Sequence, residues 1–224
     1  MKRIRIYIIL VVAFCSLLSA CGLDNYDAPE ARLTGRVTYN GNPVGVRGSN
    51  ESVRLQLWQD GFPLKTPIDV FVTQDGSFSS SLFNGTYKLV TVSGNGPWAH
   101  TSDTLVVNIS GQAQVDFPVQ PYFALSDIQY ELQGTELVAT CRVAQLDASK
   151  TLEEINLLIN DTQFVDLGHF IAREASTSMV DGQVTLRFDI ADELSSSSAI
   201  FARVGLKING ITEAVYDSQI EKIK

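Results

Sequence analysis

Val53-Arg54-Leu55-Gln56-Leu57-Trp58 alternates apolar and polar side chains over six consecutive residues. A period of two is typical of a β-strand with one face in a core and the other toward water. Ile68-Asp69-Val70-Phe71-Val72 and Leu105-Val106-Val107-Asn108-Ile109 alternate in the same way. The stretch and its neighbours therefore predict a β-sheet for this half of the chain.

Turn residues separate these predicted strands. Asn40-Gly41, Asp60-Gly61, Asp75-Gly76 and Asn84-Gly85 each place a glycine after Asn or Asp, where a tight turn needs a positive φ. Short strands at this spacing predict a small β-sandwich. The pattern ends at Pro118-Val119-Gln120-Pro121, and two prolines in four residues predict a domain boundary.

A second set of alternating strands follows this boundary and ends in a hairpin around Asn209-Gly210. The hairpin resembles the closing hairpin of fibronectin-III or immunoglobulin-like sandwiches, and about a hundred residues is the usual size of that fold. We therefore predict an all-β chain with two tandem β-sandwich domains, over residues 32–120 and 121–224. The strands of the second domain are predicted at Leu137–Val143, Ile155–Ile159, Val184–Ile190 and Ile200–Ile208.

The first twenty residues have the pattern of an export signal. A basic start, Met1 to Arg5, precedes the apolar run Ile6 to Leu18, which is too short to span a bilayer stably. Leu18-Ser19-Ala20-Cys21 resembles the bacterial lipobox, in which Cys21 would carry a lipid and the chain would be cut before it. We predict a signal peptide over 1–20 and a lipidated flexible tether over 21–31. The alternative is an ordinary signal peptide with a chance cysteine.

Charge and position narrow the expected partners. The formal charge of the chain is −8, and losing the three basic residues of the signal gives −11 (−8 − 3). An acidic protein repels nucleic acid, so nucleic acid is not an expected partner, and membrane attachment has to come from the lipid. Asp24, Asp27 and Glu30 resemble the signal that sends Bacteroidetes lipoproteins to the outer leaflet of the outer membrane. An unsorted tether is the alternative.

Few residues have the pattern of a catalytic or metal site. The two histidines, His100 and His169, fall in different predicted domains and in no nucleophile or metal signature. Cys141 is the one cysteine left once Cys15 is removed and Cys21 is lipidated, so we expect it as a buried free thiol. We predict no enzyme activity, no metal and no cofactor. A carboxylate pair that meets on folding remains an open alternative.

Four segments of the first half resemble the transthyretin-like, or carboxypeptidase-regulatory-like, β-sandwich. They are Leu33-Thr34-Gly35-Arg36-Val37, Gly41-Asn42-Pro43-Val44, Asp75-Gly76-Ser77-Phe78 and Gly85-Thr86-Tyr87-Lys88-Leu89. This resemblance implies a fold and no chemistry.

Four further segments resemble the N-terminal domain of an uncharacterised lipoprotein family of Bacteroidetes. They are Val44-Gly45-Val46-Arg47-Gly48, Leu55-Gln56-Leu57-Trp58-Gln59, Thr66-Pro67-Ile68-Asp69-Val70 and Gly94-Asn95-Gly96-Pro97-Trp98. Members of that family lie near genes for SusC/SusD-type glycan-uptake systems. The resemblance therefore implies a glycan and a SusC/SusD-type transporter complex as partners, without an assigned activity.

Two tryptophans are the candidate sugar-binding platforms, because sugars stack on aromatic rings and hydrogen-bond to nearby polar groups. Trp58 falls on the polar face of its strand, where it could pair with Phe71 across strands. Alternatively, it packs under a loop or the second domain. Trp98 shares a loop with Asn95 and His100, and the alternative is that it closes this loop over the sandwich edge.

These patterns, together with the resemblances, imply a non-catalytic outer-membrane lipoprotein on the cell surface that binds glycans as an accessory to a polysaccharide-uptake system. The rival hypothesis is a structural or docking subunit of a surface complex that binds no sugar.

Replacing Cys21 tests the predicted anchor. Cys21→Ser should abolish incorporation of labelled palmitate and move the protein from the membrane to the soluble fraction, because the thioether is the expected attachment. Cys141→Ser is the matched control and should change neither result. A Cys21→Ser protein that remains membrane-bound would contradict the prediction.

Overall fold

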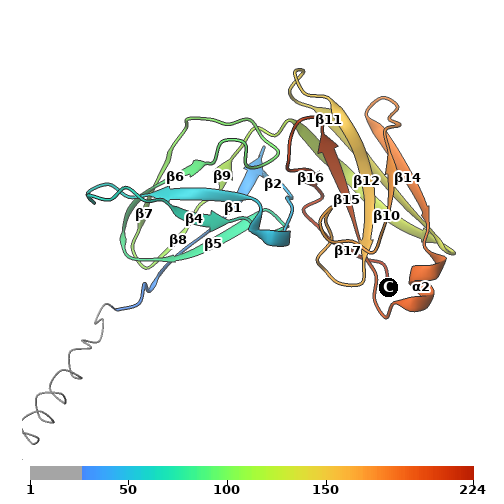
Figure 1. The fold of residues 1–224 in the computed structure, drawn as a ribbon, viewed down its shortest axis with the longest axis horizontal. Helices are drawn as coiled ribbons and strands as arrows, with labels where there is room; N and C mark the ends of the chain where they lie inside the picture. The colour runs from blue at the N-terminus through green and yellow to red at the C-terminus, as the bar shows by residue number, and fades with distance from the viewer. Residues whose placement is uncertain (1–26) are drawn as a thin grey trace, which may run out of the picture.

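The computed structural model describes residues 27–224 and shows two β-sandwich domains in tandem (Figure 1). The predicted all-β fold of two tandem domains is confirmed. The predicted signal peptide, Cys21 and most of the tether lie outside the described residues. Strand β1 begins at Ala31, the last residue of the predicted tether. No helix within residues 27–224 is long and apolar enough to cross a membrane.

The first domain packs two sheets face to face. Strands β2, β1 and β5 form one sheet, in which β8 and β9 run parallel to β1, and the other sheet has the order β4-β3-β6-β7. The bounds are β1 Ala31–Tyr39, β2 Asn42–Pro43, β3 Arg54–Trp58, β4 Ile68–Phe71, β5 Ser77–Leu82, β6 Gly85–Thr91, β7 Leu105–Ile109, β8 Gln112–Gln114 and β9 Phe117–Pro118, with a 3-10 helix, η2, at Ser49–Glu51.

The alternation of β3 sets the core of this domain. Leu55 and Leu57 are buried and pack in one cluster with Leu33 of the facing sheet. The polar positions between them face outward, as the period of two requires. Burial of these apolar side chains is the main favourable term that holds the two sheets together.

The second domain packs the three-stranded sheet β10-β11-β14 on the sheet β13-β12-β15-β16, which β17 extends along β15. Cys141 is a buried free thiol in its core, as predicted, and burial raises its pKa to about 11. The bounds are β10 Phe123–Gln133, β11 Glu136–Gln145, β12 Leu152–Asn160, β13 Ala172–Ser176, β14 Gln183–Asp189, β15 Phe201–Ile208, β16 Val215–Tyr216 and β17 Glu221–Lys222, with helix α2 at Ala191–Ser196.

Strands β12 and β15 are buried on both faces. Every residue of β12 from Ile155 to Asn160 is buried, without alternation. Continuous burial means that something covers the second face of the sheet as well. A small apolar cluster on that face, which contains Leu158, Val165 and Tyr216, lies where the first domain meets the second.

Arg203 of β15 crosses this interface and has no exposed surface. Its guanidinium donates to the carbonyl oxygens of Val46 and Gln74 in the first domain. It also donates to the carbonyls of Val165 and Asp217 in the second. One buried side chain therefore hydrogen-bonds to both domains at once.

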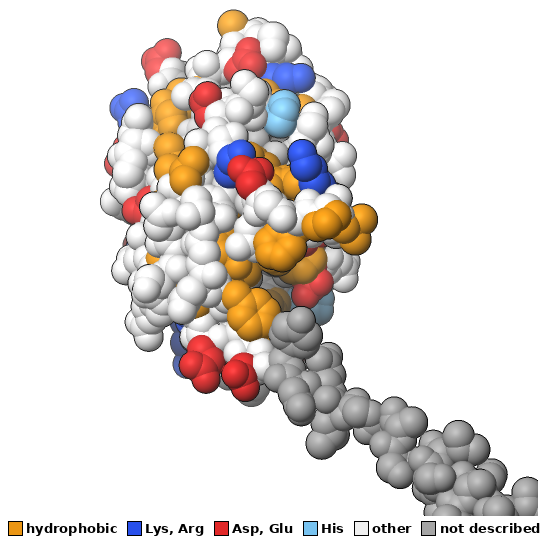
Figure 2. Space-filling view, turned by 90° about the vertical axis from the view of Figure 1, so that its left-hand side faces the viewer, with side chains coloured by type: hydrophobic (Ala, Val, Ile, Leu, Met, Phe, Trp, Pro, Cys, Tyr) orange, Lys and Arg blue, Asp and Glu red, His pale blue; other side chains and the backbone are white. Residues whose placement is uncertain are grey.

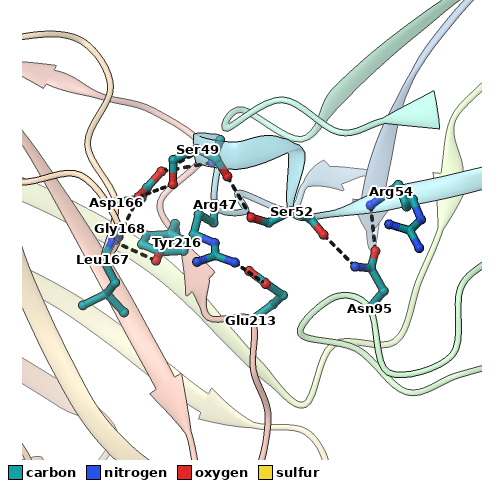
Figure 3. A network of polar contacts seen from close by, with 11 residues as sticks. Arg47, Ser49, Ser52, Arg54, Asn95, Asp166, Leu167, Gly168, Glu213 and Tyr216 are labelled. Carbon is teal, nitrogen blue, oxygen red and sulfur yellow. Dashed lines mark hydrogen bonds and ion pairs between the residues drawn. The ribbon is translucent and has the colours of Figure 1, made fainter. Parts of the chain in front are cut away.

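Further polar contacts join the two domains (Figure 3). The backbone N–H of Ser49 and its hydroxyl donate to the two carboxylate oxygens of Asp166, at 3.0 and 2.9 Å. Arg47 forms an ion pair of 2.7 Å with Glu213. Both contacts join the segment before β3 to loops of the second domain, so the domains meet through a specific polar network.

A close backbone approach completes the interface. The Tyr216 N–H donates to the Gly45 carbonyl at 3.0 Å. A Cβ built on Gly45 would lie 2.5 Å from the carbonyl oxygens of Tyr216 and Asp217. Only glycine allows these two backbone segments to approach this closely.

Arg203→Met should lower the free energy of unfolding by about 3 kcal/mol or more, because four buried carbonyls lose their donor. Urea unfolding followed by circular dichroism measures the change, and the single transition should split as the domains uncouple. The matched control is Arg187→Met, which removes an exposed ion pair with Glu136 and should cost at most about 1 kcal/mol. Equal destabilisation by the two changes would contradict this role of Arg203.

Candidate ligand-binding groove between the domains

An open groove of about 1110 Å³ lies where the hairpin of β1 and β2 in the first domain faces β10 and the segment after β16 in the second. Most of its side chains are polar or charged. It is lined by Arg36, Asn42, Pro43, Leu125, Ser126, Asp127, Ile128, Gln129, Tyr130, Glu131, Val138, Thr140, Tyr216, Asp217, Ser218, Gln219 and Glu221.

A β-bulge in β10 shapes one wall. Ser126 pairs with Arg142 and Gln129 with Thr140, so three steps along β10 match two along β11. Asp127, inside the bulge, has a φ of 51°. Bulges bend a strand and redirect its side chains, and they are common beside functional sites.

Tyr130 and Asp217 line the groove but are already used by the fold. The Tyr130 hydroxyl donates to Asp217 Oδ2 at 2.9 Å and accepts from the Val204 N–H at 2.9 Å. Asp217 Oδ1 also accepts from the Gln219 N–H. Burial raises the pKa of Tyr130 well above its ordinary value. These hydrogen bonds hold the Tyr130 and Asp217 side chains in place at the groove wall.

Other groove side chains have no polar side-chain partner within the described residues. The side chains of Arg36, Asn42, Gln129, Glu131 and Gln219 are exposed and make no side-chain hydrogen bond or ion pair with any residue in the range 27–224. These groups supply both donors and acceptors. They are available to hydrogen-bond a polar ligand.

Two smaller hollows extend the groove. At one end, an apolar pocket of about 150 Å³ shares Asn42 and Pro43 and adds the aromatic rings of Tyr39 and Phe123. Further along, a hollow of about 490 Å³ shares Gln129 and runs over β11 and β14. Together the three hollows form a continuous polar surface with an apolar pocket beside it.

The prediction of Trp98 as a sugar-binding platform has to be corrected. Its side chain is 3% exposed and belongs to the core cluster of the first domain, and it forms an isolated β-bridge with Pro121. The ring is therefore unavailable for stacking on a sugar. The alternative interpretation, a tryptophan that closes its own loop, describes the structure.

Asn95 is also used by the fold. Its side-chain oxygen accepts from the Arg54 N–H at 2.7 Å, and its amide donates to the Ser52 carbonyl at 2.6 Å (Figure 3). His100 is exposed, with Nδ1 3.4 Å from the Thr91 hydroxyl. Asn95 thus holds its loop to the start of β3 through both ends of its side-chain amide.

Trp58 lies at the other end of β3, about 13 Å from Arg54 at the usual rise per residue. The structure therefore does not bring Trp58 together with Asn95. Trp58 is partly exposed on the outer face of its sheet, opposite Lys88. Phe71 lies opposite Arg54, so the two rings do not pair. Trp58 remains an accessible ring outside the groove.

The groove also holds carboxylates, which bears on the alternative of a hydrolase. Asp127, Glu131, Asp217 and Glu221 line it, but Asp217 is held by two hydrogen bonds from the protein itself. Within residues 27–224, no group of three His, Cys, Asp or Glu side chains is placed to hold a metal ion. The absence of enzyme activity stays a prediction.

Family models match both domains. Residues 31–120 match the model described as the N-terminal domain of a protein of unknown function, DUF3823, and residues 123–222 match the domain of unknown function DUF3823_C. The chain belongs to the DUF3823 family. The predicted membership of an uncharacterised family is thus confirmed. None of the curated proteins matches this DUF3823 chain.

Solved structures agree with this assignment. A DUF3823 family protein from Parabacteroides merdae is 39% identical, with a TM-score of 0.82 over 88% of this chain and 100% of its own. One from Bacteroides ovatus is 33% identical, with a TM-score of 0.78 over 87% and 98%. A protein from Bacteroides uniformis, described as a candidate carbohydrate binding protein, is 18% identical, with a TM-score of 0.70 over 88% and 99%. At that identity, the last likeness shows the fold alone.

The two tryptophans, the only ones in the chain, should report their different burial by fluorescence. Trp58→Phe leaves Trp98 and should give blue-shifted emission that acrylamide quenches weakly, because the ring lies in a core. Trp98→Phe leaves Trp58 and should give red-shifted, readily quenched emission. Equal quenching of the two variants, with circular dichroism unchanged from the parent protein, would contradict the structure.

Proposed function

We propose that this DUF3823 protein is a non-catalytic outer-membrane lipoprotein on the cell surface that binds glycans as an accessory to a polysaccharide-uptake system of the SusC/SusD type. The observation that carries the proposal is the interdomain groove, where polar side chains without a partner among residues 27–224 lie beside an apolar pocket. The lipid anchor at Cys21 and the transporter partner come from the sequence resemblances.

The chemistry of the groove suits a sugar chain. Asn42, Gln129 and Gln219 offer amide donors and acceptors for hydroxyl groups. Tyr39, in the adjoining pocket, offers an aromatic face for the apolar side of a pyranose ring. Polar groups around a small apolar surface are the usual composition of such sites.

The charge of the groove favours neutral glycans over acidic ones. One arginine, Arg36, and four acids line the groove, namely Asp127, Glu131, Asp217 and Glu221. Asp127 lies 3.8 Å from Arg142. An excess of carboxylates repels uronic acids and sulfated sugars. We therefore expect neutral polysaccharides to bind more strongly than polyuronates.

The rigid interface contributes to binding. The contacts of Arg203 fix the two walls of the groove before a ligand arrives, so little ordering entropy is lost on binding. Trp58, on a separate face, supplies a second weak contact for the same polymer. Two weak sites on one surface-attached molecule raise the overall avidity. One structural relative described as a candidate carbohydrate binding protein supports this proposal.

Affinity electrophoresis against a panel of neutral and acidic polysaccharides tests the proposal. At least one neutral polysaccharide should retard the protein, and Gln129→Ala and Tyr39→Ala should each reduce retardation, because each removes a groove contact. The matched control is Gln114→Ala, an exposed glutamine on β8 outside the groove, which should behave as the parent protein does.

Retardation by no glycan would overturn the proposal and favour the rival structural or docking role. Retardation that only Trp58→Ala abolishes would move the binding site to the outer face of the β4-β3-β6-β7 sheet.

A further inference from the structure

We infer that the end of the first domain where the described chain begins is a bilayer-contacting tip, formed by Phe62, Leu64 and Phe83. The inference rests on the proposed lipid anchor for its direction. It goes beyond the glycan-binding function, because it assigns a second interaction surface and its partner, the lipid bilayer.

These three side chains are large, apolar and uncovered by other described residues. Phe62 is 58% exposed, Leu64 79% and Phe83 54%. Figure 2 views the molecule from the side of the first domain and shows hydrophobic side chains gathered on this face, close to where the described chain begins. Large apolar side chains that gather on a surface mark sites of interaction.

Strand pairing places the three residues at one end. Ala31, the first residue of β1, pairs with Leu82, so Phe83 lies beside the point where the chain enters the domain. The connection from β3 to β4 carries Phe62 and Leu64. It starts at Gln59, whose side-chain amide lies 2.7 Å from the Cβ position of Gly85, next to the turn that holds Phe83.

The tether brings this end to the membrane. Ten residues, Cys21 to Glu30, separate the proposed lipid from β1, and a fully extended chain of that length reaches about 35 Å at most. The end of the domain that holds Ala31 is therefore the end nearest the bilayer.

Its chemistry also fits a membrane interface. Phe62-Pro63-Leu64-Lys65 puts a lysine directly after the apolar residues, and Lys65 forms no ion pair with any residue in 27–224. Aromatic and aliphatic side chains with a neighbouring lysine suit the headgroup region, where the amine stays in water.

Contact at this tip would orient the groove. Strand β1 runs from Ala31 at the tip to Tyr39 at the interdomain pocket, a rise of about 26 Å over eight steps. A domain that stands on its tip therefore holds the groove above the lipid surface and open to the outside.

Quenching by brominated lipids tests the inference. The mature chain, with a histidine tag in place of Cys21, is tethered to phosphatidylethanolamine and phosphatidylglycerol vesicles that contain nickel-chelating lipid and brominated acyl chains. Trp58→Phe removes the exposed native tryptophan, and Leu64→Trp or Phe62→Trp adds a probe at the tip. Val180→Trp, a position of the second domain that is 73% exposed, is the matched control.

Both tip probes should lose about half of their emission or more on brominated vesicles, and the Val180→Trp probe should lose none, because only the tip enters the acyl boundary. Two independent tip variants guard against the failure of one to fold. Tip probes that are quenched no more than the control would overturn the inference.

Because the tag replaces the natural lipid, this result does not depend on lipidation of Cys21 or on glycan binding. If the tip probes are unquenched while Leu64→Ser abolishes co-purification with a membrane protein, the tip docks onto protein, and the bilayer assignment is overturned.

Discussion

The guanidinium of Arg203, buried between the two domains, is the interaction on which the rest of the structure depends. A buried charge is costly unless it is well hydrogen-bonded, and this one donates to four backbone carbonyls, two from each domain. Its carbon Cζ also lies 4.6 Å from the centre of the Tyr216 ring, where a cation is favourable. Burial lowers the pKa of Arg203 to about 10, so the side chain stays charged at neutral pH. Lysine lacks the planar fork of five donors needed for this arrangement.

The fixed interface determines the shape of the groove and its position relative to the apolar tip. One wall of the groove comes from the β1–β2 hairpin and the other from β10 and the segment that follows β16, so its shape exists only while the domains keep one orientation. The close approach of Gly45 to Tyr216 and the ion pair of Arg47 with Glu213 restrict that orientation further. A single rigid body can present a groove at its middle and an apolar tip at the end that carries the tether.

The fold was predictable from sequence because alternation and turn glycines are local signals. Leu55 and Leu57 face inward as their period required, and Asn40-Gly41 turns with positive φ at both residues. The site was much less predictable. Trp98 shows no periodicity that separates a ring over solvent from a ring over a sandwich edge, and it is buried. The groove is formed by residues about 90 positions apart, such as Asn42 and Gln129. No local sequence pattern therefore predicts it. Gly45, a glycine outside a turn, was a signal of the close approach between the domains.

The most direct test of the central claim is the relative orientation of the domains in solution, measured by residual dipolar couplings of backbone amides. The couplings of residues 31–120 and of residues 123–222 should fit one alignment tensor, with the same magnitude and axes, because the contacts of Arg203 join both domains into one body. Two tensors of different magnitude would show domains that move independently, and would contradict the account.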